Sequence, residues 1–351
     1  MNIDQLRSKV RNWDQIHSGN PVARAKYGQI LDQIEYHARR EWRRYIPAEH
    51  TDFNSNYMDR LASWIGNALS DVDQQLLLEY ALMISFFSHE DFTALYRTAM
   101  EREITRWVAS QTKARLQSQP HHQFSDHLRD EVNNRTWFCP ITDSMDINEF
   151  YKINHLKGVG HRPAFSSLQL QAEDPVNPNS QIALFWHRYM SNPGQDQKMI
   201  RPSLKRIVLL EDIVGSASQC ENAISWAVRS FGFPVLFVPL ILCPNGVERL
   251  RDLEKKFSGK LTVCPVVEVQ RGDLLGPERR GEAGWDISVA LEDLIDRYHA
   301  FIDPDIDPYG YRNTGCSIST FANTPDNTIP IVHHTTEHGR WAPLFPRVYR
   351  N

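Results

Sequence analysis

The feature that most constrains this chain is a run of apolar residues that leads, through two acids, into a loop of small side chains. Residues 207–210 are all aliphatic, and Glu211 and Asp212 follow them directly. Residues 215–218 are only Gly, Ser and Ala, and a helical pattern then continues to residue 230. This order predicts a buried strand, a tight loop and a helix, which together form the repeating unit of α/β folds.

The same alternation recurs over the second half of the chain. Short apolar runs predict strands at 182–186, 206–210, 234–242, 261–269 and 317–321. Helical patterns lie at 216–230, 246–257 and 288–301. Continuous apolar strands that alternate with helices indicate a parallel sheet covered on both faces. We therefore expect an α/β fold in which strand 206–210 lies between strands 182–186 and 234–242.

The first 120 residues have a different pattern, with apolar positions recurring at helical spacing. They predict a helical N-terminal domain, for which a winged-helix arrangement is one candidate. Ser88 precedes a third helix as its expected N-cap. The polar stretch 121–136 has few apolar residues and is the expected linker. Residues 137–351 are then the α/β domain, with its C-terminal tail as a hood.

The acid pair and the loop after it suggest a particular chemistry. Backbone N–H groups at a helix N-terminus bind phosphate, and small residues allow a phosphate to approach. Adjacent carboxylates can accept hydrogen bonds from sugar hydroxyls, so the segment suits a sugar phosphate such as phosphoribosyl pyrophosphate. The structural alternative is a strand whose acids merely begin the next helix. Asp212 would then stabilise the N-terminus of that helix electrostatically. The candidate loop residues are Gly215, Ser216, Ala217, Ser218 and Gln219.

The segment resembles the motif of type I phosphoribosyltransferases: a strand, two acids, two apolar residues and a small-residue phosphate loop. The resemblance implies that Glu211 and Asp212 are the catalytic acids and hold the ribose 2′ and 3′ hydroxyls. The loop 215–219 would hold the 5′-phosphate, and Mg²⁺ would accompany the pyrophosphate. This chain departs from the motif at Ala217, where a Gly is expected, and at Gln219, where Thr is usual.

Three further segments, 137–144, 322–330 and 341–347, are similar to a divergent phosphoribosyltransferase-like family of prokaryotic anti-phage systems, including retrons. That resemblance implies an effector or accessory protein, with a reverse transcriptase and its RNA–DNA product as partners. It adds four candidate residues near the site: Asp143, Ser144, Asn323 and Asn327.

Composition limits other functions. A net charge of −4 gives no general attraction for nucleic acid, and no apolar run is long enough to span a membrane. Five scattered cysteines without a CxxC pair indicate reduced thiols. We therefore expect a cytoplasmic protein without a metal held by protein ligands alone. The cluster at 333–338 does not match a metal motif and favours surface histidines instead.

The sequence leaves open whether the chain turns over its ligand. One hypothesis is an enzyme that acts at the ribose C1′. The alternative is an inactive nucleotide-binding module that docks on a reverse transcriptase complex, and Ala217 favours it because its methyl opposes a positive φ and close approach to a phosphate. The acceptor and the oligomeric state are also open.

Overall fold

A computed structural model gives the structure of the protein and divides it into two compact units. It describes residues 1–16, 25–42, 45, 47, 56–116, 121–156, 204–230, 232–336 and 341–348. The first unit, here called the helical unit, combines Met1–Phe92 with Gln270–Asn351. The second, called the sheet unit, is Thr93–Val269. The sheet unit contains the acid pair and the loop after it.

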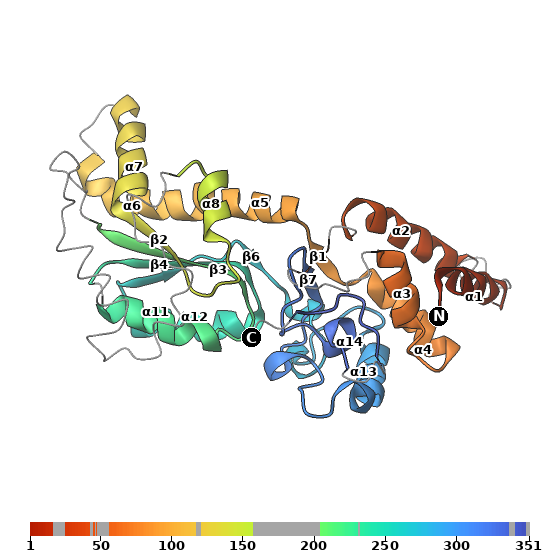
Figure 1. The fold of residues 1–351 in the computed structure, drawn as a ribbon. Helices are drawn as coiled ribbons and strands as arrows, with labels where there is room; N and C mark the ends of the chain where they lie inside the picture. The colour runs from red at the N-terminus through yellow and green to blue at the C-terminus, as the bar shows by residue number, and fades with distance from the viewer. Residues whose placement is uncertain are drawn as a thin grey trace. The chain divides into compact units, whose positions relative to one another are not determined.

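The sheet unit is built on a parallel sheet, as the sequence predicts (Figure 1). Its strands follow the order β2-β3-β4-β5, and β6 also pairs with β4. All of these pairings are parallel. The strands are β2 (Thr136–Pro140), β3 (Arg206–Val214), β4 (Val235–Leu242), β5 (Leu261–Val263) and β6 (Val267–Glu268). The expected neighbour β4 is confirmed, but the other neighbour of β3 is β2; residues 182–186 lie outside the described residues.

Helices cover both faces of this sheet (Figure 1). On one face, α11 and α12 share a core with the strands, which includes Ile207, Leu209 and Phe237. On the other face lie α6 and α8. The helices are α5 (His89–Thr98), the π-helix η2 (Ala99–Ile104), α6 (Thr105–Leu116), α7 (His121–Arg135), α8 (Ile147–Ile153), α11 (Ser218–Ser230) and α12 (Pro244–Lys256).

The pairing register explains where the acid pair lies. Pairing of β2 with β3 ends at Pro140, opposite Leu210. Pairing of β3 with β4 continues to Val214, opposite Leu242. The expectation that the acids follow the end of the strand is therefore corrected: Glu211 and Asp212 lie within β3, because β4 extends it by four residues.

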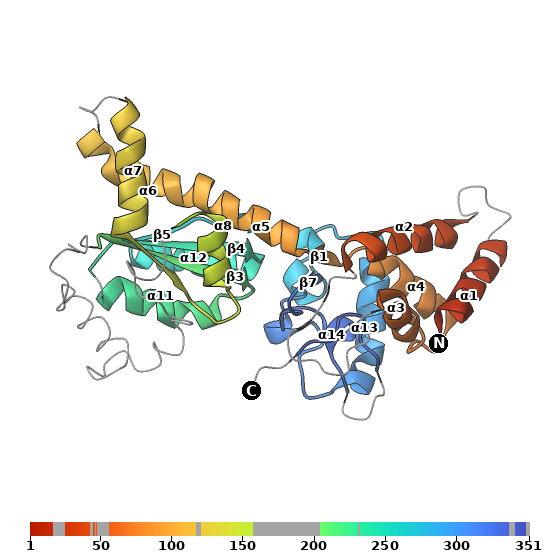
Figure 2. The ribbon, with the colours of Figure 1, turned by 45° about the horizontal axis from the view of Figure 1, so that its top comes forward.

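The helical unit contains the N-terminal helices expected from the sequence (Figure 2). The one strand described among the first 92 residues, β1, pairs in parallel with β7 and does not form the hairpin of a winged helix. Ser88 caps α5 as expected, since its Oγ accepts from the N–H of Asp91 at 3.2 Å. The elements are α1 (Ile3–Ile16), α2 (Lys26–Arg40), α3 (Tyr57–Ile65), α4 (Asp71–Ala81), β1 (Ser85–Phe87), η4 (Arg271–Asp273), η5 (Pro277–Arg279), α13 (Ser288–Ile302), η6 (Tyr311–Asn313), β7 (Ile318–Thr320) and α14 (Pro330–His333).

The C-terminal tail belongs to the helical unit because it bonds to the N-terminal helices. Trp64 Nε1 donates to the carbonyl of Ile331 at 2.6 Å, in a buried contact. Arg60 Nε donates to the carbonyl of Leu344 at 2.9 Å. The expected linker 121–136 lies within the sheet unit, where it forms α7 and the first residue of β2. The compact units thus follow a different division from the expected domains, since contacts distant in sequence join the chain's two ends.

No helix in the described part of the chain is both long and apolar enough to cross a membrane. The five cysteines are all free thiols. His333 corrects the expectation of surface histidines, because it is buried within α14 and its Nε2 contacts the carbonyl of Thr328 at 2.9 Å. Burial lowers the pKa of His333 to about 3. Two members of that cluster, Glu337 and His338, lie outside the described residues.

Candidate functional site

Successive side chains of a strand point to opposite faces, so the two acids face different helices. Glu211 shares its face with Ile207 and Leu209, which pack towards α11 and α12. Asp212 shares the other face with Val208 and Leu210. The loop between β2 and α8 lies beside the end of the β2–β3 pairing and contacts both acids. One loop therefore joins two carboxylates that the strand itself separates.

Glu211 is buried, with 4 % of its surface exposed. The backbone N–H of Thr142 donates to its Oε2 at 2.9 Å, and Thr142 Oγ1 lies 2.5 Å from its Oε1. Burial and the neighbouring Asp212 carboxylate raise the pKa of Glu211 well above its ordinary value, against the lowering effect of the Thr142 hydrogen bonds. The charge of Asp143 adds to the increase. Glu211 thus holds the loop in place from inside the protein.

Asp212 is half-buried and lies nearer to solvent than Glu211. Ser144 Oγ donates to its Oδ1 at 2.9 Å, and the N–H of Ile213 donates to the same oxygen at 2.8 Å. Burial, together with the nearby charges of Asp212, Glu149 and Asp146, raises the pKa of Tyr96. The carboxylate of Asp212 therefore accepts from Ser144, and its charge acts on the buried Tyr96.

The loop 215–217 leads directly into α11, as the sequence predicts. The hydroxyl oxygens of Ser216 and Ser218 lie 3.0 Å apart. The first N–H groups of a helix have no partner within the helix, so they can bind an anion. Glu221, in the first turn, pairs with Arg249 of α12 at 3.2 Å. The geometry offers hydroxyl and N–H donors together, three residues after Asp212.

Ala217 shows the cost of replacing the glycine of the motif. It adopts φ 58°, the left-handed region that disfavours residues with a Cβ atom. Its side chain is buried, with 3 % exposed. The loop also packs closely, since a Cβ atom added to Gly246 of α12 would lie 2.8 Å from the carbonyl oxygen of Gly215. The departure seen in the sequence therefore falls on a strained position of the loop.

The four additional candidates divide between the units. Asp143 and Ser144 lie in the loop that contacts the acid pair. Asn323 and Asn327 belong to the helical unit. Asn323 Nδ2 donates to the carbonyl of Val348 at 2.9 Å, and Asn327 Nδ2 donates to Thr314 Oγ1 at 3.1 Å. These two amides thus hold the tail together.

Sequence reasoning missed two residues near the acids. Thr142 binds Glu211 through its N–H and its hydroxyl, and the charge of Asp212 helps to raise the pKa of Tyr96 of α5. The Thr-x-Ser spacing directly after the mostly apolar residues 137–141 was the available signal for Thr142. Nothing in the local pattern of α5 distinguishes Tyr96 from its other aromatic residues.

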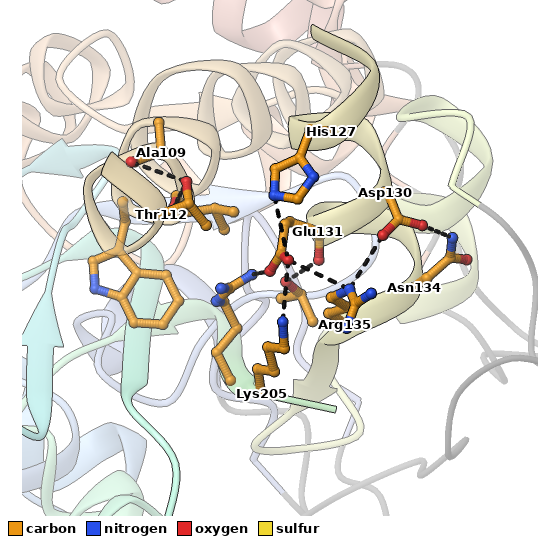
Figure 3. A network of polar contacts seen from close by, with 12 residues as sticks. Ala109, Thr112, His127, Asp130, Glu131, Asn134, Arg135 and Lys205 are labelled. Carbon is orange, nitrogen blue, oxygen red and sulfur yellow. Dashed lines mark hydrogen bonds and ion pairs between the residues drawn. The ribbon is translucent and has the colours of Figure 1, made fainter. Parts of the chain in front are cut away.

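A second polar cluster lies at the opposite end of the sheet, where β2 and β3 begin (Figure 3). Its centre is Glu131 of α7, whose side chain is 1 % exposed. Arg206 NH1 lies 2.8 Å from Glu131 Oε2, and Lys205 Nζ lies 3.3 Å from Oε1. Arg135 and His127 also approach Oε1, at 3.3 and 3.7 Å. Four basic side chains thus surround one buried carboxylate.

The parallel sheet with helices on both faces makes the sheet unit an α/β fold. A sequence model of the PRTase-CE family matches residues 61–347, so the chain belongs to this phosphoribosyltransferase-like family. Comparisons with curated proteins and with solved structures give no match. The matched span begins in α3 and ends in the tail, so it includes the whole sheet unit and part of the helical unit.

Proposed function

We propose that the protein binds a phosphoribosyl or nucleotide ligand at Asp212 and the loop 215–219. One observation carries the proposal. The carboxylate of Asp212 lies in β3, and three residues later a loop with hydroxyl side chains begins and leads into α11, a helix of thirteen residues. The two groups suit the two ends of a phosphoribosyl unit. Asp212 and Ser144 would accept and donate hydrogen bonds at the ribose hydroxyls, while Ser216, Ser218 and the N–H groups of α11 would hold the 5′-phosphate.

Mg²⁺ is the proposed cofactor. Carboxylate oxygens suit Mg²⁺, but the described residues contain no group of three or more His, Cys, Asp or Glu side chains that could hold a metal ion. We therefore propose that the phosphate oxygens of the ligand supply most of the coordination. Bound in this way, the ion would reduce the charge of a pyrophosphate group.

The first candidate activity is transfer at the ribose C1′. Breaking the bond at C1′ builds positive charge on the sugar, and a nearby carboxylate stabilises that charge. Asp212 is the carboxylate proposed for this role. Lys157, Arg162 and Arg188, which could neutralise a pyrophosphate, lie outside the described residues.

The second candidate is a nucleotide-binding module without turnover. The strained Ala217 favours it, because a methyl group at φ 58° occupies the loop where the motif has glycine. The similarity of residues 322–330 and 341–347 to anti-phage proteins supports a role in such a system, with a reverse transcriptase complex as the proposed partner.

Calorimetric titration with phosphoribosyl pyrophosphate and Mg²⁺ tests the proposed ligand. Saturable binding supports the proposal, and its absence in the folded protein contradicts it. Incubation with the same donor and candidate acceptors, followed by analysis of pyrophosphate and nucleotides, separates the two candidates. Release of pyrophosphate indicates transfer, whereas binding without release indicates the inactive module.

A further inference from the structure

Four oxygen atoms form a continuous chain between the two acids. Glu211 Oε1 lies 2.5 Å from Thr142 Oγ1. Thr142 Oγ1 lies 2.6 Å from Ser144 Oγ. Ser144 Oγ lies 2.9 Å from Asp212 Oδ1. Each distance is that of an O–H···O hydrogen bond, so the chain contains three such bonds.

The hydroxyls cannot supply three protons. Each hydroxyl carries one proton, and an ionised carboxylate carries none. If both acids were ionised, the hydroxyls of Thr142 and Ser144 would supply two protons for the three oxygen–oxygen contacts. One of these contacts would then have no proton between its two oxygen atoms. One additional proton completes the chain. The Oε2 atom of Glu211 accepts from the N–H of Thr142 at 2.9 Å, so Oε1 is the oxygen available to carry it.

We infer that the folded protein holds one proton on Glu211 Oε1. Thr142 and Ser144 then continue the chain of hydrogen bonds from Glu211 to an ionised Asp212. Glu211 then donates to Thr142, Thr142 donates to Ser144, and Ser144 donates to Asp212. In this arrangement no covalent bond to a carbon atom forms or breaks. Glu211 is a positioning residue, and Asp212 is the one charged member of the pair.

The surroundings of Glu211 favour the protonated form. Within the described residues, no Lys, Arg or His side chain forms an ion pair with Glu211, which contrasts with Glu131. Burial and the charge of Asp212 raise its pKa well above the ordinary value. Among the described residues, the other titratable groups that influence the acids and their neighbours are acidic or neutral: Asp143 in the loop, Asp146 at the start of α8, Glu149 of α8, Tyr96 of α5 and Cys220 of α11.

For the ligand, this inference rests on the proposed function and makes it more specific. A pair of ionised acids beside a phosphate site would present two negative charges, and both would repel a polyanionic ligand. A pair that shares one proton presents a single negative charge to the ligand, on Asp212. The family motif implies that both acids hold ribose hydroxyls, whereas here the buried Glu211 acts through Thr142 and Ser144.

The variant Glu211→Gln tests the inference because an amide copies a protonated carboxyl group. Its N–H can donate to Thr142 Oγ1 while its oxygen accepts from the N–H of Thr142. Without ligand, infrared difference spectra at about pH 6, well above the ordinary pKa of a glutamate, should show a protonated carboxyl band in the parent that Glu211→Gln lacks. The exposed Glu282 gives the control Glu282→Gln, which should retain the band. No band lost in Glu211→Gln overturns the inference.

Binding gives the second readout. Glu211→Gln should bind phosphoribosyl pyrophosphate within about twofold of the parent, since the charged member of the pair is unchanged. A loss of roughly tenfold or more in a folded Glu211→Gln protein overturns the inference, because an ionised Glu211 would then contact the ligand. If the parent itself does not bind, the proposed function fails, while the infrared result still decides the protonation of Glu211.

Discussion

Two buried glutamates occupy the opposite ends of one parallel sheet. Glu131 lies where β2 and β3 begin and has four basic neighbours (Figure 3). Burial alone would raise the pKa of Glu131, but Arg206 and Lys205 outweigh it and lower the pKa. Glu211 lies near the other end, beside a second acid, and its pKa is raised. Two buried glutamates thus have pKa values shifted in opposite directions, because their neighbours carry opposite charges.

The two glutamates distinguish a structural end of the sheet from the end that we propose binds the ligand. At the first end, Arg206 and Lys205 neutralise the buried acid and join α7 to the start of β3. At the other end, Asp212 remains near solvent beside the loop of α11. Ligands of open α/β sheets bind at the carboxyl ends of strands, which agrees with this division.

We expect the largest effect, a loss in the free energy of unfolding, when the charge of Glu131 is removed from the structural end of the sheet. Glu131→Gln leaves the buried Arg206 without its carboxylate, and removing one partner of a buried ion pair costs roughly 3 to 5 kcal/mol. Denaturant unfolding should show this loss in the free energy of unfolding. The matched control is Glu221→Gln, whose half-exposed pair with Arg249 is worth about 1 kcal/mol or less. Equal losses in the two variants would contradict the role given to the Glu131 cluster.

The two glutamates should also give opposite pH dependence. The lowered pKa of Glu131 adds stability above its unfolded value of about 4.3, and this contribution is lost as pH falls. The raised pKa of Glu211 has the opposite effect, since stability is lost as pH rises from about 4.3 through its folded pKa. Unfolding over a pH series should show the destabilisation of Glu131→Gln shrinking in acid.

In the same series, Glu211→Gln should become more stable than the parent as pH rises from about 4 towards 8. Its advantage should disappear at the acid end, where the parent glutamate is protonated in both states. If the free energies of unfolding of Glu131→Gln and Glu211→Gln changed with pH in the same way relative to the parent, the two glutamates would not differ in charge state.

How far the sequence predicts this site depends on which contacts are local. A strand that begins at residue 206, a loop and a helix that ends at residue 230 follow from a continuous pattern and are confirmed. The strand continues to Val214 and the helix begins at Ser218, which the pattern did not predict. The contact of Thr142 with Glu211 joins residues 69 positions apart and requires β2 to pair with β3. No local pattern specifies that pairing. The bond from Trp64 to Ile331 spans 267 positions, which explains why the tail's place in the helical unit was not predicted.

The smallest expected effect concerns Ala217 in the loop that is proposed to bind the ligand. A left-handed φ costs an L-residue roughly 1 to 2 kcal/mol, so Ala217→Gly should raise the free energy of unfolding by about 1 kcal/mol. Ligand affinity should stay equal or improve. The control Ala94→Gly, at an exposed position of α5, should instead lose about 1 kcal/mol. A loss in both variants would contradict strain at Ala217.

The central claim is that Asp212 and the loop of α11 form the ligand site, and calorimetry with phosphoribosyl pyrophosphate tests it most directly. Asp212→Asn keeps the side-chain shape but removes the charge, which should weaken binding by roughly ten- to a hundredfold, or about 1.5 to 3 kcal/mol. Ser216→Glu should weaken binding further, because it places negative charge where the phosphate lies. Both variants should keep the circular dichroism spectrum of the parent. If both folded variants bind the ligand as the parent does, the acids and the loop serve only the fold, and the account is wrong.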